Sequence, residues 1–214
     1  MAVGLNGSVL HVTESFAGGV LAAIHDYISA TPTFEHHLVY GARPDAPLAD
    51  SDLEGFATVR AMPEGHASRI RQLRNIVAET DPFVVHAHSS FGGAYARLAL
   101  NARRVRIVYT PHCYAFERRD ISPLARLLYR ALEQVLSWNT SAYAACSPRE
   151  VVLSRWFGSR AEVDLVPNVP PGGSLPSPAE ISIPAPSTRL LIAAAGRASK
   201  QKDPDFFLES VAAA

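Results

Sequence analysis

A turn near the end of the sequence places the only two lysines of the chain close to an arginine. Lys200 and Lys202 follow Arg197, whereas the other 18 basic residues are all arginines. The turn separates an apolar run at 190–195 from a helical pattern at 203–214. Strand ends that face helix N-termini often bind phosphate. The turn is therefore a candidate phosphate site, although turn chemistry alone favours a solvated polar turn.

Two histidines separated by one residue lie at the end of another apolar run. His86 and His88 are followed by Ser89. Alternate residues of a strand face the same side, so both imidazoles should point together. Two histidines can begin a metal site, but no nearby carboxylate or cysteine completes a ligand set. We therefore expect no metal, and interpret these residues as the polar lining of a cleft or as hydrogen-bonded residues of a strand end.

A polar and aromatic segment at 109–116 contains His112, Cys113 and Tyr114. His112 could hydrogen-bond a ligand hydroxyl or phosphate, act as an acid or base, or fix a turn. The residues alone leave these roles open. Cys113 is a weaker candidate as a thiol nucleophile, because adjacent residues usually point apart.

Paired glycines, Gly18 and Gly19, follow the first apolar run and Glu14. Such a pair lets the backbone approach a ligand closely, and the helix after it offers free N–H groups and a positive dipole end. The segment is not GxGxxG, so the nicotinamide and flavin fingerprint is absent. A dehydrogenase is the least favoured enzyme class.

A helical pattern at 122–138 carries a wide apolar face, with Arg118, Arg119, Arg126 and Arg130 around its first half. The simpler interpretation is a helix that faces the core and keeps its arginines in water. The alternative is a surface that meets anionic lipid or a lipid-linked acceptor.

Composition narrows the class of protein. The chain is 48% hydrophobic and 19% charged, and its formal net charge of +0 disfavours a general nucleic-acid binder. Cys113 and Cys146 form no CxxC pair, so neither a disulfide framework nor a zinc site is expected, and a reducing compartment is the simpler assumption. We find no secretory signal and no run of 18 apolar residues. We expect a cytoplasmic protein that can contact the inner face of a membrane.

Strand and helix patterns alternate along residues 8–166. The expected strands are 8–13, 37–40, 56–60, 83–87, 105–109, 142–145 and 163–166. The expected helices are 18–27, 65–79, 92–102, 122–138 and 147–157. Strands separated by helices indicate βαβ units with right-handed crossovers. The fold class predicted is α/β, with a Rossmann-like, doubly wound parallel sheet.

The last part of the chain predicts a second, incomplete domain. Residues 167–187 contain seven prolines, which is typical of an interdomain linker. Residues 188–214 contain one strand pattern and one helix pattern. A single βα unit cannot bury both faces of a sheet. We therefore expect an N-terminal domain at 1–166 and the truncated start of a C-terminal Rossmann-like domain at 188–214.

The order of these motifs resembles the retaining glycosyltransferases of family 4, which are two-domain GT-B enzymes. Six motifs carry the resemblance: Val9-Leu10-His11-Val12 with Gly18-Gly19, Val84-Val85-His86-Ala87-His88-Ser89, Tyr109-Thr110-Pro111-His112, Ala144-Ala145-Cys146-Ser147, Val166-Pro167-Asn168-Val169, and Gly196-Arg197 with Lys202.

The resemblance implies a role for each matching residue. Gly18 and Gly19 would lie near the donor diphosphate, and Arg197 and Lys202 would hold that diphosphate without a metal or other cofactor. His112 would contact the donor sugar as the catalytic-site histidine. We expect the acceptor-side cleft to be lined by Glu14, His86, His88, Ser89 and Tyr114. The family's Glu-x7-Glu motif is absent from these 214 residues, so we expect this chain alone to be inactive.

The resemblance implies transfer of a hexose from a nucleotide-diphosphate sugar to a hydroxyl acceptor, in polysaccharide or glycolipid synthesis. Two alternatives stay open. A sugar-nucleotide epimerase shares the GT-B layout, although residues 11–19 lack the Gly-Thr-Arg-Pro pattern of that family. A non-catalytic partner subunit is the third hypothesis.

Overall fold

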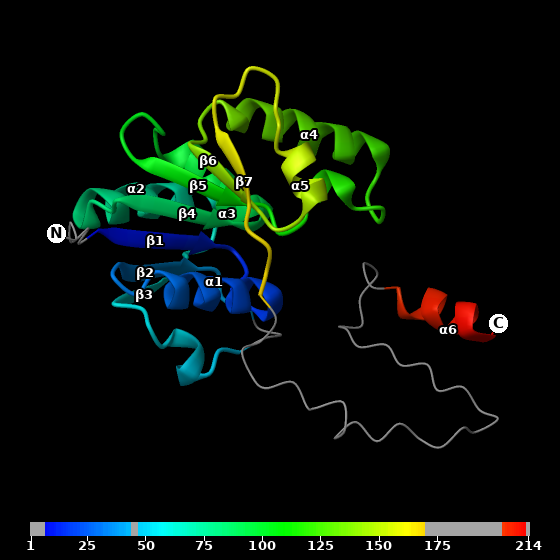
Figure 1. Cartoon of the computed structure of the whole chain (residues 1–214), viewed down its shortest axis with the longest axis horizontal. Helices are drawn as coiled ribbons and strands as arrows, with labels where there is room; N and C mark the ends of the chain where they lie inside the picture. Colours follow the sequence, from blue (N-terminus) through cyan, green and yellow to red (C-terminus); the bar gives the residue numbers. More distant parts are fainter. Residues whose placement is uncertain (1–6, 44–46, 170–202, 213–214) are drawn as a thin grey trace.

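The computed structural model describes residues 7–43, 47–169 and 203–212 (Figure 1). Seven parallel strands form one sheet in the order β3-β2-β1-β4-β5-β6-β7. This order confirms the predicted α/β Rossmann-like, doubly wound fold. The strands are β1 (Ser8–Thr13), β2 (Glu35–Tyr40), β3 (Thr58–Ala61), β4 (Val84–His88), β5 (Arg106–Thr110), β6 (Ala142–Ala145) and β7 (Glu162–Leu165).

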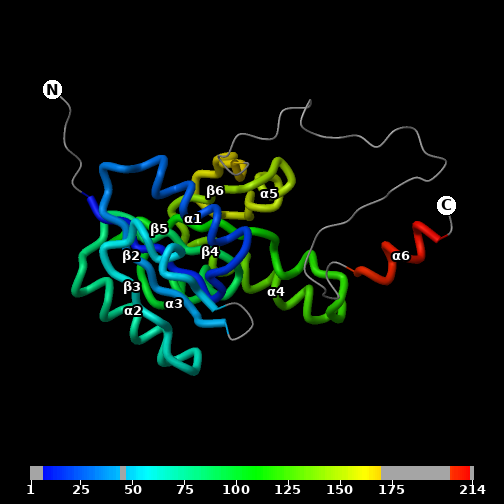
Figure 2. The backbone as a smooth tube through the Cα atoms, turned by 90° about the horizontal axis from the view of Figure 1, so that it is seen from below, coloured from blue at the N-terminus to red at the C-terminus, as the bar shows by residue number. Residues whose placement is uncertain are grey.

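Helices cover both faces of the sheet (Figures 1 and 2). Leu38 and Val39, adjacent in β2, belong to different core clusters, because neighbouring strand residues face opposite sides. α1 packs its Ile24 against Leu38, whereas α2 and α3 pack Ile76 and Tyr95 into the cluster that contains Val39. The helices are α1 (Gly18–Ala30), α2 (His66–Thr80), α3 (Ser89–Ala99), α4 (Pro123–Ser137), α5 (Pro148–Leu153) and α6 (Pro204–Ala212), with 3-10 turns η1 (Asp50–Leu53) and η2 (Ala115–Glu117).

Two helices have a serine N-cap at the first residue of the expected helical ranges, 122–138 and 147–157. The Ser122 hydroxyl accepts the N–H of Ala125 at 3.2 Å, and the Ser147 hydroxyl accepts the N–H of Glu150 at 3.2 Å. A proline occupies the first turn of each helix, where it loses no intrahelical hydrogen bond. These caps fix where the chain leaves the loops after β5 and β6.

The predicted start of α3 was wrong. The helix begins at Ser89, and Gly92 and Gly93 lie inside it. A Cβ on Gly92 would lie 2.8 Å from the Val12 carbonyl oxygen, and one on Gly93 would lie 2.3 Å from a ring carbon of Tyr109. The glycines therefore let α3 approach the sheet closely. α5 also ends earlier than expected, at Leu153.

The chain reverses its direction of travel across the sheet at β1. This strand pairs in parallel with β2 on one side and β4 on the other. The loops after β1 and β4 therefore diverge, and a crevice forms at the carboxyl ends of these two strands. Ligands of open α/β sheets bind in such crevices.

Part of the predicted second domain lies outside the described residues. That part includes the strand expected at 190–195 and both candidate phosphate ligands, Arg197 and Lys202. α6 falls within the helix expected at 203–214 and has no buried residue. The boundaries at 166 and 188 stay a prediction.

Candidate functional site

A pocket of about 340 Å³ opens at the carboxyl ends of β1, β4 and β5. We call it the switch-point pocket, because it lies where the strand order reverses. It brings together three of the residues expected at the site, Glu14, Ser89 and His112. Its lining is Glu14, Ser15, Val20, Ser89, Ser90, Phe91, Ala94, Pro111, His112, Cys113, Ala115, Arg118, Tyr129, Leu132 and Glu133.

Backbone strain is concentrated at this pocket. Ser89, His112 and Cys113 have φ values of 61°, 51° and 96°. Among the residues that the structure describes, these are three of the five non-glycine residues with positive φ. Each such residue costs about 1–3 kcal/mol and persists only where surrounding contacts enforce it. Strain of this kind is a common property of ligand-binding sites.

The Glu14 carboxylate lies at the start of α3. Its Oε2 accepts the backbone N–H of Gly92 at 3.0 Å. Burial raises the pKa of Glu14, while the N–H groups of the Gly92 region oppose that shift. A carboxylate that is partly desolvated and faces a pocket can accept a hydrogen bond from a ligand hydroxyl.

Sequence reasoning missed Glu150, which holds the loop that carries His112. This buried carboxylate accepts the N–H of Cys113 at 2.8 Å and the N–H of Cys146 at 2.9 Å. It therefore ties the loop after β5 to the end of β6. The one sequence signal for Glu150 was the segment Ser147-Pro148-Arg149-Glu150, which has the pattern of a capping box. That pattern does not indicate the contacts with Cys113 and Cys146.

His112 has a protein partner at each ring nitrogen. Its Nε2 lies 3.2 Å from Nδ1 of His88, and its Nδ1 lies 3.6 Å from Sγ of Cys146. Burial lowers the pKa of His112 to about 4. The imidazole is therefore neutral at pH 7, which disfavours the acid role considered from the sequence.

Three residues expected in the acceptor-side cleft lie elsewhere. Tyr114 is 0% exposed and its hydroxyl bonds Ser154 at 2.8 Å, because its ring packs in the core beside Phe116. His88 is also fully buried, beneath His112. His86 bonds the Thr110 hydroxyl at 2.8 Å inside the sheet layer. We therefore correct these three placements: the pocket is lined instead by residues that follow the strands.

The paired glycines lie at the exposed start of α1. Gly18 has a φ of 55°, which favours glycine, and a Cβ at either position would meet nothing within 4 Å. No neighbouring atom would prevent a larger side chain from occupying position 19. The space around both glycines is compatible with the predicted contact to a donor diphosphate, which remains a prediction.

The interior histidines approach one another closely. His11, His86 and His88 are buried, and their ligand atoms lie within 4.8 Å of one another, so this trio has the spacing of a possible metal site. Burial lowers the pKa of all three, to about 3 for His86. The sequence indicated only the pair in β4, because His11 is 75 residues earlier in the chain.

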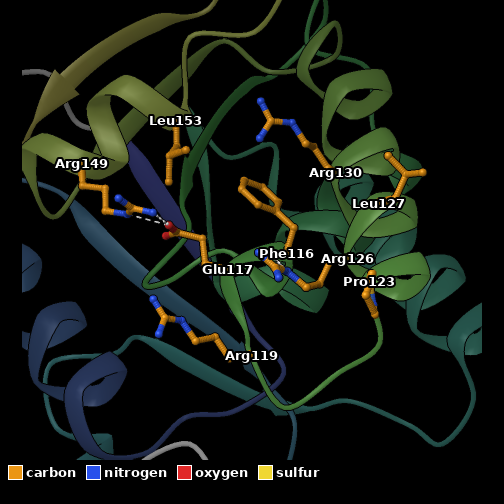
Figure 3. A pocket seen from close by; sticks show the side chains of 9 residues that line it. All are labelled: Phe116, Glu117, Arg119, Pro123, Arg126, Leu127, Arg130, Arg149 and Leu153. Atoms are coloured by element: carbon orange, nitrogen blue, oxygen red, sulfur yellow. Dashed lines mark hydrogen bonds and ion pairs between the residues drawn. The ribbon is translucent and has the colours of Figure 1, made fainter.

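A second hollow, of about 650 Å³, lies beside η2, α4 and α5 (Figure 3). We call it the arginine hollow. It is lined by Phe116, Glu117, Arg119, Pro123, Arg126, Leu127, Arg130, Arg149 and Leu153. Glu117 is the only acid among these residues, and it pairs with Arg149. Arg126 donates to the Phe116 carbonyl at 3.0 Å, and Arg130 lies over the Phe116 ring. The lining therefore has an excess of positive charge.

The expected burial of the apolar face of α4 was wrong. Leu124, Leu128, Val135 and Trp138 are between 55% and 66% exposed, and they follow one another at helical spacing. The helix packs through the opposite side, where Glu133 pairs with the buried Arg97 at 2.8 Å. We call the exposed residues the apolar stripe of α4. In the described parts of the chain, no helix combines the length and apolarity needed to cross a membrane.

The sheet order and the switch-point pocket define a Rossmann-like α/β class of protein. Residues 18–169 match the model of the glycosyl transferase 4-like domain. The chain belongs to that family. Among curated proteins it is similar to an uncharacterized 41.2 kDa protein in the cps region of Klebsiella pneumoniae, with 23% identity over 149 residues. The matched region covers 65% of this chain and 40% of that relative.

Solved structures share the fold. Sucrose-phosphate synthase from Thermosynechococcus elongatus aligns with a TM-score of 0.51 and 14% identity, over 76% of this chain and 48% of that one. Anabaena HepE in complex with UDP and glucose aligns with a TM-score of 0.54 and 16% identity, over 76% of this chain and 44% of that one. A UDP-N-acetylglucosamine 2-epimerase aligns with a TM-score of 0.54 and 13% identity, over 80% of this chain and 53% of that one. The described domain is therefore the GT-B type of Rossmann-like domain.

Proposed function

We propose that the protein takes part in retaining transfer of a hexose from a nucleotide-diphosphate sugar to a hydroxyl acceptor. The observation that carries this proposal is the switch-point pocket, which joins Glu14, Ser89 and His112 in a glycosyl transferase 4-like domain. The chain spans less than half of the curated relative that it matches. The activity is therefore proposed for the complete gene product.

In the proposed reaction, the bond between the anomeric carbon and the diphosphate oxygen breaks, and the acceptor oxygen bonds to the same face of that carbon. The diphosphate leaves with the bonding electron pair, and the acceptor hydroxyl gives its proton to the departing diphosphate oxygen. Arg197 and Lys202 would neutralise the leaving diphosphate, so the proposal needs no metal. Glu14 would hydrogen-bond the acceptor hydroxyl, and His112 would contact a hydroxyl of the donor sugar.

An epimerase is the alternative within the same fold, and the similar UDP-N-acetylglucosamine 2-epimerase keeps it open. The two reactions differ in what they need, because epimerisation requires no acceptor. The complete gene product should be incubated with UDP-hexoses, with and without a hydroxyl acceptor, and the products identified by mass spectrometry and NMR. Product that forms only with acceptor supports transfer, whereas an isomerised nucleotide sugar formed without acceptor supports the epimerase.

We also propose that the enzyme works in the cytoplasm at an anionic membrane surface, which suits a lipid-linked glycan acceptor. The arginine hollow and the apolar stripe both lie along α4, so phosphate and acyl-chain contacts could form together. Each arginine near an anionic surface contributes about 1 kcal/mol. The occupant proposed for the stripe is therefore lipid.

Vesicle flotation tests this second proposal. Vesicles of phosphatidylglycerol should bind the protein, and vesicles of phosphatidylcholine should not. Combined Arg126→Gln and Arg130→Gln should weaken binding by about tenfold or more. Combined Arg103→Gln and Arg104→Gln is the matched control, because it also removes two exposed arginines and both lie outside the arginine hollow. Equal binding to both vesicle types would refute the requirement for anionic lipid, and binding to neither would refute lipid as the occupant of the stripe.

A further inference from the structure

Four imidazoles form a continuous series of ring-nitrogen contacts that ends in the switch-point pocket. His36 Nδ1 lies 3.0 Å from His11 Nε2, and His11 Nδ1 lies 3.2 Å from His88 Nε2. His88 Nδ1 then lies 3.2 Å from His112 Nε2. We call these residues the histidine chain. It runs from β2 through β1 and β4 to the loop after β5.

The inner end of the histidine chain fixes where one proton lies. His36 Nε2 is 3.2 Å from the Thr31 carbonyl oxygen, which can only accept. It is also 3.2 Å from the Thr31 hydroxyl oxygen, whose own proton goes to the Tyr27 carbonyl at 2.6 Å. Both contacts require a hydrogen on His36 Nε2. In a neutral ring, Nδ1 of His36 is then an acceptor.

Because the rings are neutral, the same donor-to-acceptor direction applies to every contact of the histidine chain. Burial lowers the pKa of His11, His36, His88 and His112. A neutral imidazole has one donor and one acceptor nitrogen. His11 Nε2–H therefore donates to His36, and His88 Nε2–H donates to His11. By the same rule, His112 Nε2–H donates to His88, which leaves the Nδ1 of His112 with a lone pair.

The outer end of the histidine chain is compatible with the same arrangement. Cys146 Sγ lies 3.6 Å from His112 Nδ1. Burial raises the pKa of Cys146 to about 12, so the thiol keeps its proton at pH 7. The S–H group can donate to the lone pair on Nδ1, and because a thiol sulfur is also a weak acceptor, this contact alone does not select the tautomer. The inner end of the histidine chain selects it, and the outer contact agrees with that selection.

We infer that His36, His11 and His88 are positioning residues that hold His112 as the neutral Nε2–H tautomer. The Nε2–H of His112 is then used by His88, and a ligand that reaches Nδ1 must take the place of the Cys146 thiol as the donor to its lone pair. Its ligand partner must be a hydrogen-bond donor, such as a neutral sugar hydroxyl, and not a phosphate or carboxylate oxygen. This inference deepens the proposed function and rests on it for the identity of the ligand.

The tautomers can be measured without any substrate. Nitrogen NMR of the protein labelled at histidine distinguishes ring nitrogens that carry hydrogen from those with a lone pair. At pH 7, all four residues of the histidine chain should show the Nε2–H form. A Nδ1–H form or an imidazolium at His112 would overturn the inference. So would tight binding of one Zn²⁺ ion by His11 Nδ1 and His88 Nε2, because a metal needs lone pairs on both.

A substitution that interrupts the histidine chain tests the positioning role of His36, His11 and His88. His11→Phe removes both contacts in the middle, and a mixture of tautomers at His112 is expected. His25→Phe is the matched control, because the His25 ring bonds the Asp52 carbonyl outside the chain. An unchanged His112 tautomer in His11→Phe would show that the chain does not set it. If His11→Phe does not fold, the spectrum of the unaltered protein still decides.

The kcat/KM values of two His112 variants distinguish a hydrogen-bond acceptor role of His112 from a purely structural role. His112→Asn keeps an amide oxygen near the position of Nδ1, whereas His112→Gln places its amide near Nε2. In the complete gene product, kcat/KM should be at least about tenfold higher for His112→Asn, at similar thermal stability. Equal or reversed values would contradict the inference. Absence of transfer in the unaltered enzyme would refute the proposed function, while the NMR result would stand alone.

Discussion

Mild acid should unfold this domain, because burial lowers the pKa of five histidines, including His36, below the ordinary value of about 6.5. The lowering is largest for four of them, His11, His86, His88 and His112. The unfolded chain therefore binds more protons than the folded one below pH 6.5. Stability is complete above this pH and falls as the pH decreases toward the folded values, which are about 4 for His112 and about 3 for His86.

The slope of this loss follows from proton linkage. Each histidine that is protonated only in the unfolded state contributes about 1.4 kcal/mol per pH unit. The four histidines with the largest shifts together approach about 5.5 kcal/mol per pH unit once the unfolded chain is fully protonated. Small domains are stable by about 5–15 kcal/mol. Unfolding is therefore expected within about one to three units below pH 6.5.

Urea unfolding followed by circular dichroism, at intervals between pH 7.5 and pH 4.5, would measure the slope. His86→Asn should reduce the slope by the contribution of one proton, about 1.4 kcal/mol per pH unit, even if it also lowers the free energy of unfolding at pH 7.5. His66→Gln is the control, since His66 is an exposed histidine outside this group. His25, His37, Tyr27 and Cys146 also face the buried imidazoles and are unchanged in both variants. A slope below about 1.4 kcal/mol per pH unit near pH 5 would refute the reasoning.

Substitutions at Arg97, Gly93 and Gly19 test packing and the paired glycines. Arg97→Met leaves the Glu133 carboxylate buried without its 2.8 Å partner, so the free energy of unfolding in urea should fall by about 3–5 kcal/mol, and adding Glu133→Leu should restore most of it. Gly93→Ala should lower the free energy of unfolding by about 1–3 kcal/mol, because the new Cβ meets the Tyr109 ring. Gly19→Ala should leave stability nearly unchanged, because the space is open. Loss of donor affinity in that variant, measured by calorimetry on the complete gene product, would then report a ligand contact, and unchanged affinity would remove Gly19 from the donor site.

The sequence was sufficient for the architecture because local signals agreed with the fold. Apolar runs separated by helical patterns predicted the parallel sheet, and the helical patterns at 122–138 and 147–157 predicted two helix starts that the structure confirms. Gly92 and Gly93 were misleading, because glycine is also used where a helix must approach a sheet. The burial of α4 was misjudged for a similar reason: an apolar stripe shows that a face needs a partner but does not say which one.

The candidate site was only partly predictable. Residues that directly follow strands, such as Glu14, Ser89 and His112, could be placed at one edge by topology alone. The histidine chain could not, because His36, His11 and His88 meet only through the pairing of β2, β1 and β4. Tyr114 was misplaced because a loop residue that turns inward has the same sequence signature as one that faces a ligand.

Product analysis of the complete gene product tests the central claim most directly. It should be supplied with UDP-hexoses and a panel of hydroxyl acceptors, alongside His112→Ala and Arg197→Ala variants. The account predicts a glycoside that forms only with acceptor, keeps the anomeric configuration of the donor, and forms at least about tenfold more slowly in both variants. Isomerised nucleotide sugar without acceptor, inverted product, or full activity in both variants would contradict it.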